Sequence, residues 1–218
     1  MTIIKIFLDS NVVANWLLID MQIRQIRKRM KNRDNISKRI KYILSLEKTQ
    51  ARDYELIERI KKKKFNQHIF YISEFVILEA FTVLVEEYFL RASHKKGILI
   101  TYLKKSKKRT ELSEADADEM VDGLERLGKI SRKGIIEVIY FPTYSLPIAF
   151  DLIANYNQHA SDAKLLAIAI KNGCKLFVTN DSEITKSMKE FEQIETKLTD
   201  NFLRDEDKQT QNSHQKSK

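Results

Sequence analysis

The fold is decided by the stretch from His159 to Asp181, which reads HASDAKLLAIAIKNGCKLFVTND. Apolar residues at helical spacing follow Ser161, whose hydroxyl can cap the first turn of a helix. Gly173 stands where this helix would end, because glycine adopts the left-handed conformation after a helix at little cost. The short apolar run that follows is typical of a buried strand. The stretch therefore predicts a helix that is opened by Asp162 and a strand that is closed by Asp181.

Three earlier segments also predict strands, and each is followed by a helical pattern. They are residues 3–8, 70–72 and 134–141. Strands that alternate with helices are typical of an α/β domain with a mainly parallel sheet. In such sheets, binding sites lie beyond the carboxyl ends of the strands. Side chains that follow the predicted strands are therefore the first candidates for function.

The composition indicates one soluble globular domain. The chain has 218 residues, of which 43% are hydrophobic and 32% charged, and no apolar run reaches the ~18 residues of a membrane span. The single cysteine, Cys174, excludes an intrachain disulfide and favours a reducing, cytoplasmic location. The N-terminus shows no signal-peptide pattern. We expect one domain over 1–204 and, because no large apolar residue follows, a disordered tail over 205–218.

Nearly all of the positive charge lies in one segment. Residues 20–65 contain 16 lysines and arginines but 6 acids, so that they carry +10, whereas the rest of the chain carries −1. Apolar residues at helical spacing predict amphipathic helices here, and a second helical stretch covers about 91–133. A basic face is often only solvated, but a localised excess of this size also matches a phosphate-rich partner.

One acid stands in an apolar helix. Residues 75–85 are apolar at every position except Glu79 and Thr82, a pattern that predicts a helix buried on all sides. A buried carboxylate is destabilising by several kcal/mol unless it is paired, neutralised or bound to a metal ion. Glu79 is therefore expected either to form an ion pair with a lysine or arginine or to belong to a site.

Four acids are candidates for a common site: Asp9 after the first strand, Glu79, Asp162, and Asp181 after the last strand. Asp9, Asp162 and Asp181 could each be only a helix cap. Together with Glu79 they would meet at the carboxyl edge of a parallel sheet, and clustered carboxylates stay ionised only around a cation. Oxygen ligands favour Mg²⁺ or Mn²⁺, which activate water and stabilise charge on phosphoryl oxygens. Acids and a basic segment together predict metal-dependent hydrolysis of nucleic acid.

The chain resembles the PIN-domain nucleases, including the VapC-like toxin ribonucleases. The resemblance is carried by four blocks: Phe7–Asn11, Ile72–Ser73 with Glu79, Ser161–Ala163 with its helix, and Leu176–Asp181. It implies a three-layer α/β/α fold with a central, mainly parallel sheet, to which the basic helical insertions at about 20–65 and 91–133 are added.

The same resemblance implies a function and a site. It implies a metal-dependent endoribonuclease, a hydrolase that cleaves single-stranded RNA with Mg²⁺ or Mn²⁺. Asp9, Glu79, Asp162 and Asp181 would be its catalytic, metal-binding acids, and Asn11, Thr179 and Glu183 would position a ligand or water. Besides the RNA substrate, an antitoxin protein and a second copy of the chain are the expected partners.

Two alternatives stay open. A phosphatase of the haloacid-dehalogenase type also places an aspartate after its first strand, but it needs a second aspartate two residues later, where this chain has Asn11. A non-catalytic PIN-like module that binds RNA or protein is the other alternative, since a fold alone does not establish an activity.

Overall fold

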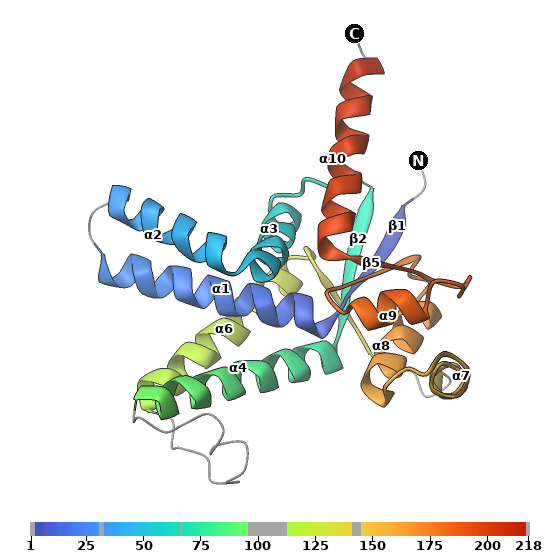
Figure 1. Cartoon of the computed structure of the whole chain (residues 1–218), viewed down its shortest axis with the longest axis horizontal. Coiled ribbons are helices and arrows are strands. Elements are labelled where there is room, and N and C mark those ends of the chain that lie inside the picture. The colour runs from blue at the N-terminus through green and yellow to red at the C-terminus, as the bar shows by residue number, and fades with distance from the viewer. Residues whose placement is uncertain (1–2, 31–32, 66, 96–112, 141–144, 217–218) are drawn as a thin grey trace.

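The computed structural model of the chain describes residues 3–30, 33–65, 67–95, 113–140 and 145–216 (Figure 1). Its centre is a five-stranded sheet of order β3-β2-β1-β4-β5, in which every neighbouring pair is parallel. The strands are β1 (Ile4–Leu8), β2 (His68–Ser73), β3 (Glu137–Ile139), β4 (Leu176–Thr179) and β5 (Glu195–Leu198). The predicted α/β class with a parallel sheet is confirmed.

One strand was not predicted. The four segments that were predicted to be strands all contribute to the sheet, whereas β5 has the polar sequence Glu-Thr-Lys-Leu. It lies at the edge and pairs on one side only, from Leu176 opposite Glu195 to Thr179 opposite Leu198. An edge strand needs little apolar surface, because one of its sides stays in contact with water. Its sequence therefore lacks the signal that identifies the inner strands.

Helices lie on both sides of the sheet. Figure 1 shows α1, α3 and α4 on one side and α7 and α8 on the other. The helices are α1 (Ser10–Arg29), α2 (Arg33–Leu46), α3 (Lys48–Lys61), α4 (Glu74–Lys95), α6 (Glu114–Arg132), α7 (Leu146–Tyr156), α8 (Ala160–Lys171), α9 (Ser182–Ser187) and α10 (Thr199–Lys216). Within the described residues, none of them is both long and apolar enough to cross a bilayer.

The two basic insertions are helical where the structure describes them. The segment 20–65 forms the second half of α1 together with α2 and α3. The segment 91–133 supplies the end of α4 and all of α6, and its middle, 96–112, lies outside the described residues. Helix α2 buries no residue, whereas α3 packs closely on α1. Residues 20–65, which we call the basic arm, are thus attached to the core through α3.

The helix α8 begins and ends close to the predicted positions. Gly173 follows it with a φ of 71°, the left-handed conformation that was predicted. The cap at the other end was assigned to the wrong residue. His159 is the N-cap, so Ser161 lies inside the first turn together with Asp162. The acid at the start of α8 is thereby held above the carboxyl edge of the sheet.

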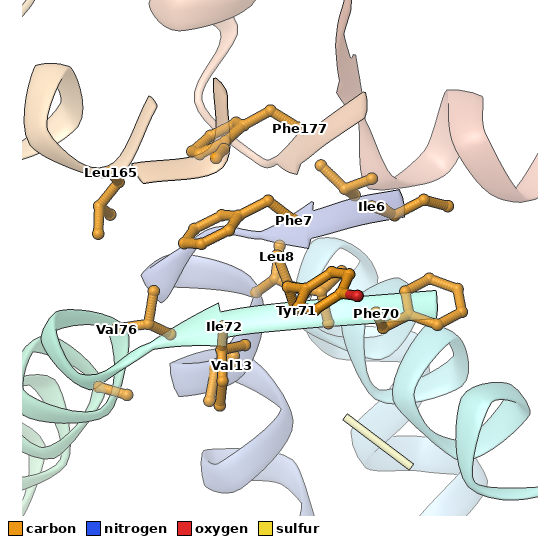
Figure 2. Packing of buried hydrophobic residues seen from close by; sticks show 14 of the residues in the cluster. Ile6, Phe7, Leu8, Val13, Phe70, Tyr71, Ile72, Val76, Leu165 and Phe177 are labelled. Carbon is orange, nitrogen blue, oxygen red and sulfur yellow. The ribbon is translucent and has the colours of Figure 1, made fainter. Parts of the chain in front are cut away.

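The core joins β1 and β4 through aromatic stacking. The rings of Phe7 and Phe177, which lie opposite each other in the register, have centroids 5.5 Å apart and nearly parallel planes. Figure 2 shows Leu165 of α8 beside this pair, with Ile72 and Val13 on the other side of the strands. Both faces of the central strands are therefore buried, as expected for a parallel sheet. This packing sets the relative heights at which β1 and β4 end.

The prediction of a disordered tail over 205–218 is wrong for the residues that the structure describes. Helix α10 continues through Lys216. Only its first turns are apolar and buried, at Phe202 and Leu203. Beyond them α10 is attached by ion pairs that the sequence could not reveal, because their partners are distant: Arg59–Asp207, His68–Glu206 and Lys197–Asp205.

Loss of one of these ion pairs should loosen α10 without unfolding the domain. The Arg59 guanidinium binds Asp207 at 2.6 Å, and both side chains are partly exposed. Arg59→Ala should therefore lower the local stability of α10 by about 1 kcal/mol, as is typical of exposed pairs. Hydrogen exchange of the α10 amides should speed up by about fivefold while exchange in β1 stays unchanged. Unchanged exchange in α10 would show that the pair is not needed.

Candidate functional site

The four candidate acids come from four elements at one edge of the sheet. Asp9 directly follows β1, and Asp181 lies two residues beyond the end of β4. Asp162 is in the first turn of α8, and Glu79 is in the second turn of α4, the helix that directly follows β2. Because β1, β2 and β4 are parallel neighbours, all four elements present these acids at the carboxyl edge. The topology thus brings together residues that are up to 172 positions apart.

Asp9 is the most buried acid of this group. Its side chain is almost inaccessible, at 3% exposure. One oxygen, Oδ1, accepts a hydrogen bond of 2.7 Å from the backbone N–H of Ser10, and Oδ2 accepts one of 2.6 Å from the Thr179 hydroxyl. Burial raises the pKa of Asp9 to about 6 against these hydrogen bonds, and the charges of Asp162 and Glu79 raise it further. A bound cation would relieve both effects.

A polar network ties the end of β4 to the start of α1. The Thr179 hydroxyl, which donates to Asp9, accepts from the Asn11 side-chain amide at 3.1 Å and from the backbone N–H of Asp181 at 2.9 Å. The Asn11 carbonyl oxygen in turn accepts from the backbone N–H of Asn180 at 3.1 Å. Asn11 and Thr179 therefore fix the relative positions of Asp9 and Asp181.

Asp181 combines a structural contact with its place at the edge. Its Oδ1 accepts from the backbone N–H of Glu183 at 2.6 Å and, more weakly, from that of Ile184, so that it caps α9. Glu183 itself is exposed, with its backbone engaged in this cap. The cap leaves the Oδ2 atom of Asp181 outside these hydrogen bonds.

Asp162 and Glu79 complete the acidic edge. Partial burial raises the pKa of Asp162, the charges of Asp181 and Glu79 raise it further, and His159 opposes them. The interactions link Asp162 to Asp181 and Glu79, and Asp9 to Asp162 and Glu79, so that all four acids belong to one electrostatic cluster. Lys164 of α8 lies 3.4 Å from the ring centroid of Phe75 and holds α8 against α4.

The prediction that Glu79 is fully buried is wrong. Helix α4 is not covered on all sides, since Leu78 is 60% and Val83 39% exposed, and Glu79 itself is partly exposed. The apolar pattern overstated burial because it also includes residues on the outer face of the helix. Glu79 therefore does not suffer a full desolvation penalty, and within the described residues it forms no ion pair with a lysine or arginine.

A fifth acid, Asp53 of α3, was missed. It is 0% exposed, and its Oδ2 accepts from the side-chain amides of Asn15, at 2.8 Å, and of Asn180. Its Oδ1 is buried with no hydrogen bond of ordinary geometry in the described part of the chain, and the Thr199 hydroxyl near the carboxyl group lowers the pKa of Asp53. Burial raises the pKa of Asp53 to about 7 against these donors, and the Asp9 charge adds to the effect.

The sequence did contain a signal for Asp53. It shares the inward stripe of α3 with Leu56, Ile57 and Ile60, which are all buried. An acid on the apolar stripe of an amphipathic helix needs a partner, as was argued for Glu79. Asp53 was counted instead among the charges of the basic arm. The structure shows that it connects this arm to the carboxyl edge through Asn180.

The donor set suits a hard divalent cation, although its carboxylates are not closed around one position. All four candidate ligands are carboxylates, as Mg²⁺ and Mn²⁺ prefer. Over the described ranges, no three acids, histidines or cysteines stand close enough together to hold a metal ion as they are placed. Asp9 and Asp181 each accept a hydrogen bond from a backbone N–H group in this arrangement.

No protein-family model matches its sequence, and no curated protein matches it significantly.

Proposed function

We propose that this protein is a metal-dependent ribonuclease that hydrolyses phosphodiester bonds of single-stranded RNA at the acidic edge. The observation that carries the proposal is the convergence of Asp9, Glu79, Asp162 and Asp181 on one electrostatic cluster. Carboxylates kept together at the mouth of a parallel sheet are destabilising unless they serve a cation or a reaction. The basic arm beside them is suited to a polyanionic substrate.

Each acid has a distinct task in this proposal. Asp9 is held by hydrogen bonds from Ser10 and Thr179, and together with Glu79, Asp162 and Asp181 it would hold the metal ion. A Mg²⁺ or Mn²⁺ ion held there would activate water and neutralise charge on the scissile phosphate. The chain's own contribution is to hold the ligands, and through Asn11 and Thr179 to keep β1 and β4 in register.

The resemblance to PIN-domain nucleases supports the same function. Its blocks supply all four acids, and the parallel sheet is compatible with the three-layer fold that it implies. A toxin of a toxin–antitoxin pair is the biological setting that we propose, with an antitoxin as protein partner. The two helical insertions, and Asp53 within one of them, would be additions of this chain to that fold.

The surroundings of Asn11 disfavour a phosphatase. A phosphatase of the haloacid-dehalogenase type would need a general acid at this position. The Asn11 side chain instead donates to Thr179 and accepts from the Asn180 backbone, so that both ends of its amide are used. An aspartate here would lose the donor to Thr179. The position is thus built for an amide that joins two loops.

A direct assay tests the proposal. The full-length protein is incubated with end-labelled single-stranded RNA in Mn²⁺, in Mg²⁺ and in EDTA, with 4-nitrophenyl phosphate as a second substrate. We expect RNA fragments in the presence of either metal and none in EDTA, with no release of nitrophenol. Hydrolysis of the phosphate monoester without RNA cleavage would instead support the phosphatase.

Removal of the Thr179 hydroxyl should reduce RNA cleavage, because the positions of the neighbouring acids change while all four acids stay present. Thr179→Val keeps the shape of the side chain but loses the hydrogen bonds to Asp9, Asn11 and Asp181. The rate of RNA cleavage should fall by about 10- to 100-fold, as is typical when groups that orient metal ligands are lost. Thr179→Ser retains the hydroxyl and is the matched control. Equal activity of the two variants would exclude this positioning role.

A further inference from the structure

A groove lies between the basic arm and α10 in the part of the chain that the structure describes. It has a volume of about 1550 Å³ and is lined by residues of α3 and α10, with contributions from Arg27 and Leu44. Tyr54 and Phe65 give it partly buried aromatic surface. Asn180 also lines it, so the groove reaches the loop that carries Asp181. One side of this groove is formed by α10, whose residues from 205 onward were predicted to be a disordered tail.

The groove carries an unbalanced positive charge. Eight lysines and arginines and five acids line it. Four of these acids already have a cationic partner, in the pairs Glu55–Arg59, Glu58–Lys61, Asp200–Arg52 and Asp207–Arg59, and the fifth, Glu206, contacts the His68 ring. Four exposed lysines of the lining form no ion pair within the described residues: Lys48, Lys62, Lys63 and Lys64. Their charge is available to a ligand.

These lysines lie at the two ends of α3, which begins near the acidic edge and runs away from it. Helix α3 begins near that edge, where Asp53 contacts Asn180, and Lys48 is its first residue. Lys62, Lys63 and Lys64 directly follow its last turn, and 14 helical residues span about 21 Å. Helix α10 begins after β5 at the same edge and packs along α3 (Figure 1). The groove therefore runs from the acids toward the opposite edge of the sheet.

We propose that this groove binds the single-stranded RNA that the acidic edge cleaves, an inference that rests on the proposed function. Lys48, Lys62, Lys63 and Lys64 contact phosphates along the strand, and Tyr54 and Phe65 offer rings to unpaired bases. Burial raises the pKa of Tyr54 to about 12, so that its hydroxyl stays a neutral donor and acceptor. Asn180 lies where the strand passes from the groove to the acids.

Binding measured without metal separates this groove from the chemistry. Fluorescence anisotropy in EDTA uses a labelled RNA of about 12 nucleotides, within the range that single-strand binding modules occupy. The groove variant changes four lysines to glutamine: Lys48, Lys62, Lys63 and Lys64. The control variant removes as much charge from exposed residues away from the groove: Lys129→Gln, Arg132→Gln, Lys133→Gln and Lys175→Gln.

We expect the groove variant to bind RNA about 10- to 100-fold more weakly at moderate salt, and the control variant to bind like the wild type. The slope of log affinity against log salt should fall by about 3 for the groove variant, since each phosphate contact to a single strand contributes about 0.7. If the groove and control variants match in affinity and slope, the groove is not the binding surface. Tighter binding of the same sequence as a duplex overturns the single-strand assignment.

The two proposals fail in different ways. If the groove variant cleaves RNA in Mn²⁺ at the wild-type rate, the acidic edge remains the proposed nuclease site and the groove is excluded as the RNA-binding surface. If RNA binds through the four lysines in EDTA but is not cleaved with any metal, the groove is supported as the binding surface and the nuclease activity is excluded.

Discussion

Asp9→Asn is expected to reduce RNA cleavage by about 10³-fold or more while making the metal-free protein more stable. The loss follows because Asp9 is the acid coupled to Asp162 and Glu79, and a metal ligand that loses its charge forfeits several kcal/mol in the transition state. The asparagine keeps the shape and an oxygen for the Ser10 N–H, whereas its amide nitrogen cannot accept from the Thr179 hydroxyl, so the stability gain is smaller than the relief of burial alone.

The gain in stability follows from burial. The pKa of Asp9 rises from 3.8 to about 6 on folding, so at pH 7.5 the folded protein holds a carboxylate that is better solvated when unfolded. A neutral asparagine avoids this penalty and should stabilise the protein by up to about 3 kcal/mol in EDTA. Urea unfolding and single-turnover cleavage in Mn²⁺ measure both effects on the same variant.

An exposed acid provides the control for Asp9. Asp151 of α7 is exposed and contacts only Asn155 in the described structure, so Asp151→Asn should change neither cleavage nor stability. Wild-type cleavage by the Asp9 variant would contradict the nuclease and favour the non-catalytic binding module. A variant that is both inactive and unstable would show that Asp9 is required for the fold.

The sheet could be predicted because its inner strands carry their own signals. β1, β2 and β4 are short apolar runs, and Gly173 marks the turn before β4. Parallel pairing then places the residues after these strands at one edge, whatever the distance between them in sequence. Asp9 and Asp181 were therefore identifiable from local pattern and topology, and Asp162 from its place at the start of a helix.

The rest depended on contacts between distant segments. Glu79 was correctly associated with the edge, but its burial was overstated, because an apolar pattern does not show which helix faces are covered. β5 and the second half of α10 have few apolar residues and are held by pairing and ion pairs across the fold. Such charge pairs leave no periodic trace in sequence. Asp53 was missed although it lies on an apolar stripe that is visible in the sequence, because it was counted only as one of the charges of the basic arm.

Asp53→Asn is expected to stabilise the protein at neutral pH, by up to about 4 kcal/mol at pH 7.5. The pKa of Asp53 rises from 3.8 in the unfolded chain to about 7 in the folded protein, chiefly through burial. Above pH 7 the folded state therefore holds a poorly solvated carboxylate, one oxygen of which has no hydrogen bond of ordinary geometry in the described structure. Asparagine can still accept from the Asn15 and Asn180 amides at one oxygen, and it places an uncharged amide at the other position.

The dependence of the free energy of unfolding on pH tests independently whether the ionised Asp53 carboxylate destabilises the folded protein. As pH falls from about 7 toward 4, the folded protein takes up a proton at Asp53 that the unfolded chain does not, so wild-type stability rises. Between pH 7.5 and 5.5 the advantage of Asp53→Asn should therefore shrink by about 2 kcal/mol in EDTA. Urea unfolding of both proteins at the two pH values measures it.

Asp20 is the matched control for Asp53. It is also a buried acid, at 5% exposure, but Arg24 donates to it at 2.9 Å and Arg126 forms an ion pair with it at 2.8 Å. Asp20→Asn removes a charge that two cations need, and should destabilise the protein. If Asp53→Asn also destabilised it at pH 7.5, the Asp53 carboxylate would have to be held by a favourable charge. That result would make Asp53 a structural anchor of α3, whereas stabilisation marks it as an acid retained for the site beside Asn180.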